Sequence, residues 1–104
     1  MSGYEVKCQE DARLAILAEL ARQSDATLNA LSIGRVIDAL GIRRSHAWVE
    51  TQLLQLEQLG AVNLRRTELA GFGEVVVATL TRSGRDHVDR RARIAGVSPP
   101  ADQD

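Results

Sequence analysis

Residues 45–62 read SHAWVETQLLQLEQLGAV, and this stretch decides the fold. Ser45 is a residue type that caps helix N-termini, because its side-chain oxygen accepts a free backbone N–H. Apolar residues then recur at helical spacing, at Val49, Leu53, Leu56 and Leu59. Gly60 follows, at a position where helices often end in a left-handed residue. The stretch therefore predicts a helix with one apolar face that changes abruptly into extended chain.

Two further helices are expected before this stretch. Residues 10–22 carry a wide apolar face and begin with acidic residues, which favours a helix. That face fits packing in the core and a dimer interface equally well. Residues 33–40 also repeat apolar positions at helical spacing, with Ser32 as N-cap and Gly41 after the last turn. Residues 28–30 are expected to form a short extended piece between these two helices.

Beyond Gly60 the sequence pattern changes from helix to strand. Residues 61–66 alternate apolar and polar side chains, and residues 74–80 are strongly β-forming. The glycines of residues 69–73 supply a turn, so the two runs predict a β-hairpin. Thr81 then starts a last helix, with Val88, Ala92 and Ala95 along one side. The expected fold is α+β and mainly α: three helices, a two-stranded hairpin and a C-terminal helix.

The length of 104 residues suits one domain with one hydrophobic core. Residues 1–8 are interpreted as an N-terminal extension and residues 9–95 as the domain. Residues 96–104 contain Pro99-Pro100 and polar ends, a composition that does not build a core. They are predicted to form a disordered tail.

Composition narrows the class of function. The formal net charge is −1, so an argument for nucleic acid must rest on local charge. Between residues 35 and 66, five arginines meet only three acidic residues. A single cysteine, Cys8, and the lack of any apolar run of about 20 residues predict a cytoplasmic protein with no membrane segment. Cys8 itself is interpreted as incidental.

No cofactor, metal or catalytic site is expected. Cys8, His46 and His87 fall on unrelated predicted elements, so they do not form a cluster of metal ligands. The sequence contains no glycine-rich phosphate loop, nucleophile motif or metal-binding histidine pair. Both histidines are therefore interpreted as surface residues, and the protein as one that binds rather than catalyses.

Two motifs resemble a known family of proteins. The pattern Val49-x3-Leu53-x2-Leu56-Glu57-x2-Gly60-Ala61-Val62 is similar to the recognition helix and following strand of MarR- and ArsR-type bacterial regulators. Residues 80–85, Leu-Thr-Arg-Ser-Gly-Arg, resemble the Leu-Thr-x-x-Gly junction at which the second wing strand of these regulators enters the last helix. The resemblance covers residues 10–95 and implies a winged helix-turn-helix fold. Fold alone does not determine function.

The helix-turn-helix interpretation predicts a DNA-contacting surface. In this motif the outward N-terminal residues of the second helix meet base edges, while neighbouring side chains hold phosphates. The candidates on the third helix and the turn before it are Arg43, Arg44, Ser45, His46, Trp48, Thr51 and Gln52. For the first hairpin strand, the resemblance implies backbone or minor-groove contacts by Arg65 and Arg66.

Each of these assignments has an alternative. The residues Arg43, Arg44 and Ser45 fit a solvated and capped helix start equally well. Arg65 and Arg66 fit a solvated strand end nearly as well. The indole of Trp48 fits either partial burial, which we favour, or an exposed anchor for a partner. A carboxylate at Glu50 is repelled by phosphate unless it accepts from a cytosine amino group.

Two functions are consistent with these observations. The first is a DNA-binding transcriptional regulator that contacts double-stranded DNA as a homodimer, with the third helix in the major groove. The second is a protein-interaction module of the same fold that uses Trp48, Leu54 and Phe72 as apolar anchors.

Overall fold

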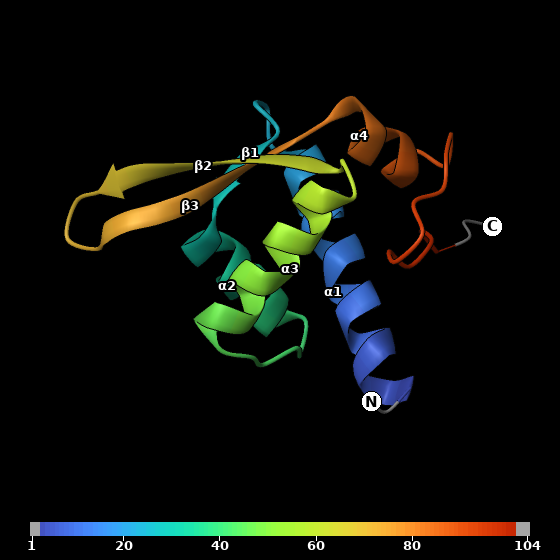
Figure 1. Ribbon diagram of the computed structural model, residues 1–104, viewed down its shortest axis with the longest axis horizontal. Helices are drawn as coiled ribbons and strands as arrows, with labels where there is room; N and C mark the ends of the chain where they lie inside the picture. The colour runs from blue at the N-terminus through green and yellow to red at the C-terminus, as the bar shows by residue number, and fades with distance from the viewer. Residues whose placement is uncertain (1–2, 102–104) are drawn as a thin grey trace.

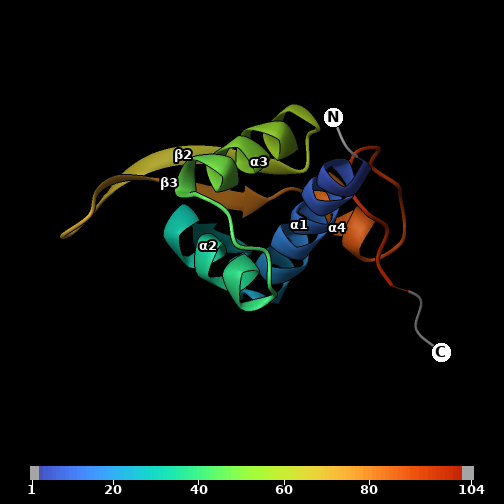
Figure 2. The same cartoon turned by 90° about the horizontal axis from the view of Figure 1, so that it is seen from below.

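The computed structural model describes residues 3–101, which form four helices and three strands (Figure 1). In chain order these are α1 (Gly3–Arg22), β1 (Thr27–Asn29), α2 (Ala30–Ala39), α3 (His46–Gln58), β2 (Val62–Leu69), β3 (Gly73–Leu80) and α4 (Arg82–Val88). Helices α1, α2 and α3 lie on one side of the sheet (Figures 1 and 2). Among the described residues, no helix combines the length and the apolar character needed to cross a membrane.

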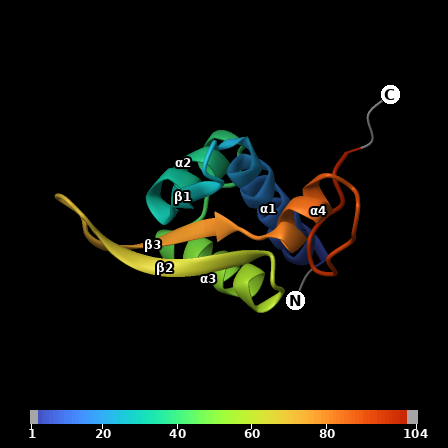
Figure 3. The same cartoon turned by 90° about the horizontal axis from the view of Figure 1, so that it is seen from above.

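The sheet has three antiparallel strands in the order β1-β3-β2, not the two that the sequence predicts. Strands β2 and β3 form the expected hairpin, in which Val62 pairs with Leu80 and Leu69 with Gly73. Strand β1 adds three residues to the other edge of β3. The hydroxyls of Thr27 and Thr79 lie 2.9 Å apart across this pair. We call β2, β3 and their turn, residues 62–80, the wing, which extends past α3 (Figure 3).

The core lies between the helices and one face of the sheet. Helices α1, α2 and α3 contribute Ile16, Leu17, Leu20, Ile33, Ile37, Val49, Leu53 and Leu56, and the sheet contributes Val62, Val76, Ala78 and Leu80. The alternation of side chains along a strand turns every second residue toward the helices. The leucine face predicted for α3 is therefore confirmed at its first three positions, whereas Leu59 at the C-cap is exposed.

Helix α1 begins at Gly3, so the interpretation of residues 1–8 as an extension is wrong for residues 3–8. No proline interrupts these residues, and Glu5 in the first turn interacts favourably with the helix dipole. Residues 1 and 2 lie outside the described part of the chain.

Helix α2 begins earlier than its sequence pattern predicts. The N-cap is Asn29, whose side-chain oxygen accepts the backbone N–H of Ser32 at 2.9 Å. Ser32, the expected cap, is thus already inside the helix. Because Asn29 also ends β1, the strand passes into the helix without a loop.

Replacing Asn29 with alanine is expected to destabilise the protein by about 1 kcal/mol, because the Ser32 N–H loses its acceptor. Urea unfolding measures this change. Asn29→Asp restores a capping oxygen and should leave stability close to that of the wild type. Ser32→Ala is the matched control and should change stability by less than about 0.5 kcal/mol. A larger loss for Ser32→Ala than for Asn29→Ala would contradict the assigned cap.

Helix α4 ends at Val88, well before the expected end at Ala95. Arg90 adopts a left-handed conformation with φ 65°, and the N–H of Arg91 donates to the carbonyl of Asp86 at 2.8 Å. This is the Schellman arrangement that closes helices, here with arginine in place of the usual glycine. The stripe of Val88, Ala92 and Ala95 therefore does not form one helical face.

Residues 89–101, which we call the C-terminal segment, pack on α1 and α4. Val97 and Ser98 are buried, and Ser98 N–H donates to the Glu10 carbonyl of α1 at 3.2 Å. The Ser98 hydroxyl contacts Asp11, and Arg13 donates to the Gly96 carbonyl at 2.9 Å. The prediction of a disordered tail is thus wrong for residues 96–101. Residues 102–104 lie outside the described part of the chain.

His87 is fully buried, which contradicts its interpretation as a surface residue. Its Nδ1 accepts the N–H of Ile94 at 3.0 Å, and its Nε2 lies 2.9 Å from the carbonyl oxygen of Ser98. Because Nδ1 is an acceptor, Nε2 carries the proton and donates to Ser98. The imidazole therefore attaches the C-terminal segment to α4 at two points.

Candidate nucleic-acid interface

Helix α3 presents an exposed face that is apolar at its centre. Ser45 caps the helix by accepting the N–H of Trp48 at 3.1 Å, as the sequence predicts. Because the buried side of α3 is formed by Val49, Gln52, Leu53 and Leu56, helical geometry turns Ala47, Thr51 and Leu54 outward. All three are exposed, with Leu54 at 52%. The helix contains no lysine or arginine.

Gln52, one of the predicted DNA-contacting residues, is buried and turned toward α1. Its Oε1 accepts from Nε of Arg13 at 2.9 Å. Burial lowers the pKa of Arg13 below its usual value, and the contacts with Gln52 and the Gly96 carbonyl satisfy the guanidinium there. Gln52 therefore joins α3 to α1 and to the C-terminal segment. No sequence pattern marked this role, because the partners lie 39 and 83 residues from Arg13.

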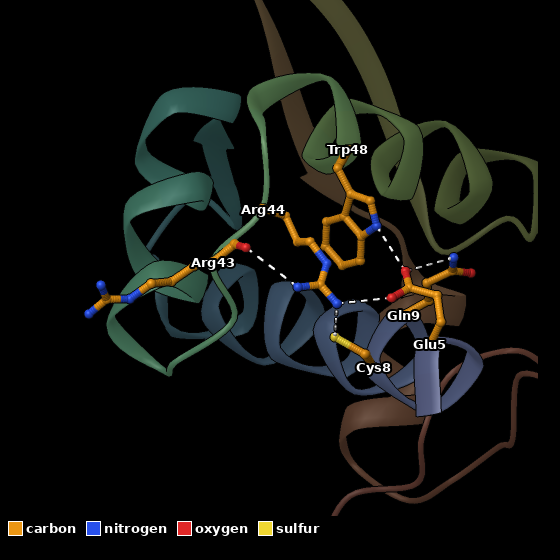
Figure 4. Close-up of polar contacts among 6 residues, drawn as sticks. All are labelled: Glu5, Cys8, Gln9, Arg43, Arg44 and Trp48. Atoms are coloured by element: carbon orange, nitrogen blue, oxygen red, sulfur yellow. Dashed lines mark hydrogen bonds and ion pairs between the residues drawn. The ribbon is translucent and has the colours of Figure 1, made fainter. Parts of the chain in front are cut away.

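Arg44 and Trp48 meet Glu5, Cys8 and Gln9 of α1 in one polar cluster, which we call the Glu5 cluster (Figure 4). Nη2 of Arg44 lies 2.9 Å from Glu5 Oε1 and 3.5 Å from Cys8 Sγ. The indole N–H of Trp48 donates to Glu5 Oε2 at 3.2 Å. The guanidinium of Arg44 also lies over the Trp48 ring, 5.4 Å from its centroid, within range of a cation–π interaction.

The Glu5 cluster fixes the start of α3 against the first turns of α1. Hydrogen bonds from Trp48 and then Arg44 hold the pKa of the Glu5 carboxyl below its ordinary value. The same carboxylate raises the pKa of Arg44. A lowered carboxyl pKa means that this pairing stabilises the fold at neutral pH and is lost as acid protonates Glu5. Cys8, interpreted as incidental, contacts this cluster.

These contacts change the expectation for two predicted DNA-contacting residues. The favoured interpretation of Trp48 is confirmed, because it is partly buried and packs against the core. Only 31% of the Arg44 side chain is exposed, and its charge is paired within the protein. In this conformation Arg44 faces α1 rather than the exposed face of α3 (Figure 4).

The remaining predicted arginines lie around α3 on neighbouring elements. Arg43 is strongly exposed in the turn before the helix, with Nε 3.9 Å from Asp38 Oδ1. Arg65 and Arg66 are exposed on β2, and Arg66 lies 3.9 Å from Glu74. Pairs at this distance on the surface contribute little stability, so these guanidinium groups remain available to an external anion.

Two hollows border α3. The first separates the middle and C-terminal part of α3 from the wing and is lined by Glu50, Leu54, Glu57, Leu64, Val76, Arg65 and Arg66. The second separates α3 from α2, and Arg35, Arg44 and His46 line it together with Asp38. Arg35 was not a candidate from sequence, since only the packing of α2 beside α3 brings it to this site. In Figures 1 and 2 the wing extends toward the side on which α2 and α3 both begin.

Two polar side chains on α3 have partners within the helix. His46 Nε2 lies 3.1 Å from Glu50 Oε2, so the carboxylate that argued against DNA has a side-chain partner one turn away. The Thr51 hydroxyl donates to the Ala47 carbonyl at 3.0 Å. Among residues 3–101, no group of three or more histidine, cysteine, aspartate or glutamate side chains is arranged to hold a metal ion.

The arrangement of these elements is similar to that of a protein whose structure was solved in complex with DNA. The crystal structure of Bacillus subtilis PadR in complex with operator DNA matches this chain with a TM-score of 0.61 and 23% sequence identity. The chain has the fold of PadR. The alignment covers 88% of this chain and 52% of the PadR chain, so the protein spans about half the length of PadR. No family model matches the sequence, and no curated protein matches it.

Proposed function

We propose that this protein is a DNA-binding transcriptional regulator, with α3 in the major groove and the wing on the DNA backbone or in the minor groove. The observation that carries the proposal is the exposed side of α3 with arginines on both neighbouring elements: Arg65 and Arg66 line the hollow toward the wing, and Arg35 lines the hollow toward α2. A helix bordered by cations fits a groove bordered by phosphates. The PadR fold supports the same conclusion, because PadR in that structure is bound to operator DNA.

We expect some residues to position the protein on the DNA through phosphate contacts and others to contact base edges. Arg43, Arg65, Arg66 and Arg35 are the candidates for phosphate contacts, because α3 itself contains no lysine or arginine. Phosphate contacts set affinity and position, whereas base edges set specificity. Ser45 acts through its cap, and Trp48 and Gln52 orient α3, so none of these three needs to touch DNA.

We also propose that the protein acts in the cytoplasm as a homodimer. A single module with a net charge of −1 makes few phosphate contacts, and a second copy doubles them. Membership of the MarR or ArsR type remains a prediction from the sequence motifs.

Replacing Arg65 and Arg66 together with alanine is expected to weaken binding to duplex DNA about tenfold. The reason is the loss of two phosphate contacts, which should also lower the slope of log K against log salt by about 2. Fluorescence anisotropy with a random-sequence duplex, measured at about 50 and 200 mM salt, tests both values.

Arg82→Ala combined with Arg85→Ala is the matched control. It removes the same charge from α4, at the opposite end of the molecule from the wing tip (Figure 1), and both residues are exposed. The control should bind like the wild type. Equal weakening by both pairs would mean that only net charge matters, and no wild-type binding at either salt would refute the proposed function.

The exposed apolar residues favour a second candidate, the protein-interaction module. Leu54 is 52% exposed and Phe72 at the wing tip is 62% exposed. Trp48 is no longer an exposed anchor, because its indole is held in the Glu5 cluster. This function predicts a partner whose binding hardly changes with salt, together with no duplex binding in the anisotropy experiment.

A further inference from the structure

We infer that α3 reads duplex DNA through thymine methyl groups, using the outward side chains of Ala47, Thr51 and Leu54. This inference rests on the proposed DNA-binding function and names the sequences it would prefer. We call these three residues the apolar stripe; they lie at positions i, i+4 and i+7 of one helix, and all are exposed. The stripe is the part of α3 farthest from its buried side.

The side chains that usually read purines are missing from this stripe. Guanine is most often read by a bidentate arginine or lysine, and adenine by asparagine or glutamine. Helix α3 has no arginine or lysine, Arg44 is paired with Glu5, and Gln52 is buried against Arg13. Its other glutamines follow Leu54 in the chain: Gln55 lies to the side of the stripe, about 100° around the helix from Leu54, and Gln58 lies one turn beyond Leu54.

The apolar stripe instead offers methyl groups. Leu54 contributes an exposed branched side chain, and Ala47 a single methyl group. The hydroxyl of Thr51 already donates to the Ala47 carbonyl, so the Thr51 methyl group is the part of this side chain that remains to contact a base. In the major groove only thymine presents a methyl group, at C5, and apolar side chains recognise it.

Glu50 adds a hydrogen-bonding group beside the apolar stripe, and this group restricts which bases fit there. It lies one turn from Ala47 and Leu54 and lines the hollow between α3 and the wing. A carboxylate accepts hydrogen bonds, so Glu50 disfavours the acceptors of guanine and suits an amino group, N6 of adenine or N4 of cytosine. The stripe therefore favours thymine, and Glu50 favours a base that presents an amino group at its own position.

Replacing thymine with uracil removes only the methyl group, so it isolates this contact. The probes are two fluorescein-labelled DNA duplexes about two helical turns long. One alternates adenine and thymine, and the other carries deoxyuridine in place of every thymidine. Burying one methyl group is equivalent to about fourfold in affinity. Wild-type protein should therefore bind the thymine duplex at least about fourfold more tightly than the uracil duplex, in anisotropy titrations at low salt.

Leu54→Ala tests whether the stripe causes this preference. The variant should lower the thymine-to-uracil affinity ratio, while the slope of its binding to a random-sequence duplex against salt, which reports the phosphate contacts, should stay that of the wild type. Leu40→Ala is the matched control, because Leu40, the C-cap of α2, is a leucine of comparable exposure, 62% against 52% for Leu54. It should keep the wild-type ratio. Thermal unfolding of both variants verifies that each is folded.

The outcomes separate this inference from the function on which it rests. Salt-dependent binding to random DNA with equal affinity for the two probes would refute methyl reading and leave the proposed function intact. A thymine preference that Leu54→Ala does not reduce would place the reading residue elsewhere and also refute the inference. Absence of binding to any duplex would refute both methyl reading and the proposed DNA-binding function.

Discussion

Replacing His87 with alanine is expected to destabilise the protein by about 4 kcal/mol. The imidazole is fully buried and bonds the Ile94 N–H and the Ser98 carbonyl. Its removal leaves a cavity and two polar backbone groups whose partner is gone, each of which costs about 1–3 kcal/mol. Urea unfolding, followed by circular dichroism, measures the change.

His46→Ala is the control for this prediction. His46 is exposed and pairs only with Glu50 among the contacts found in residues 3–101, so its loss should change stability by less than about 0.5 kcal/mol. Hydrogen exchange adds a local measurement, because the Ile94 amide should exchange faster in His87→Ala. Equal effects of the two histidine substitutions would contradict the burial and bonding assigned to His87.

Replacing Gly84 with alanine is expected to destabilise the protein by about 2 kcal/mol net. A Cβ at this position would overlap the carbonyl oxygen of Ala61 and lie 2.7 Å from Cδ1 of Leu80. The overlapped atom is backbone and already accepts the Thr81 N–H, so it cannot move away cheaply. Overpacking of about 3 kcal/mol thus exceeds the gain of about 1 kcal/mol that alanine brings to a helix. The midpoint of thermal unfolding should fall by about 10 °C.

Gly34→Ala is the matched control and should act in the opposite direction. Gly34 lies within α2, and a Cβ there would meet no heavy atom within 4 Å. Alanine should therefore stabilise the protein by up to about 1 kcal/mol. Stabilisation by both substitutions would show that the close approach of α4 to the start of the wing is not as tight as described.

The elements that the sequence predicts best are those determined by interactions between residues close in the sequence. The start of α3 depends on the hydroxyl of Ser45 and on apolar spacing within 13 residues. The hairpin depends on alternation and on glycines at its turn, and Gly71 and Gly73 indeed adopt positive φ values of 84° and 77°. The Leu-Thr-x-x-Gly motif likewise has a physical reason, since Thr81 caps α4 and Gly84 admits the backbone of residue 61.

Two of the errors concern residues whose environment is made by distant parts of the chain. Residues 96–101 resemble a polar tail, yet α1 supplies partners for Ser98 and Gly96 from more than 80 residues away. His87 resembles a surface histidine because nothing beside it in the sequence indicates that Ile94 and Ser98 fold back over it. Burial of a polar side chain is tolerated only when its partners are in place, and sequence spacing does not reveal those partners.

The candidate interface also combines features that the sequence predicts with features that only the fold creates. The sequence by itself determined which helix begins with a cap at Ser45, that a hairpin follows it, and that arginines gather between residues 35 and 66. Only the tertiary structure decided which of these side chains are available to a ligand. It turns Arg44 and Gln52 inward to Glu5 and Arg13 and leaves Ala47, Thr51 and Leu54 outward. The physical reason is that periodicity sets the face of a helix on which a residue lies, whereas charge pairing and burial depend on which other helix covers that face.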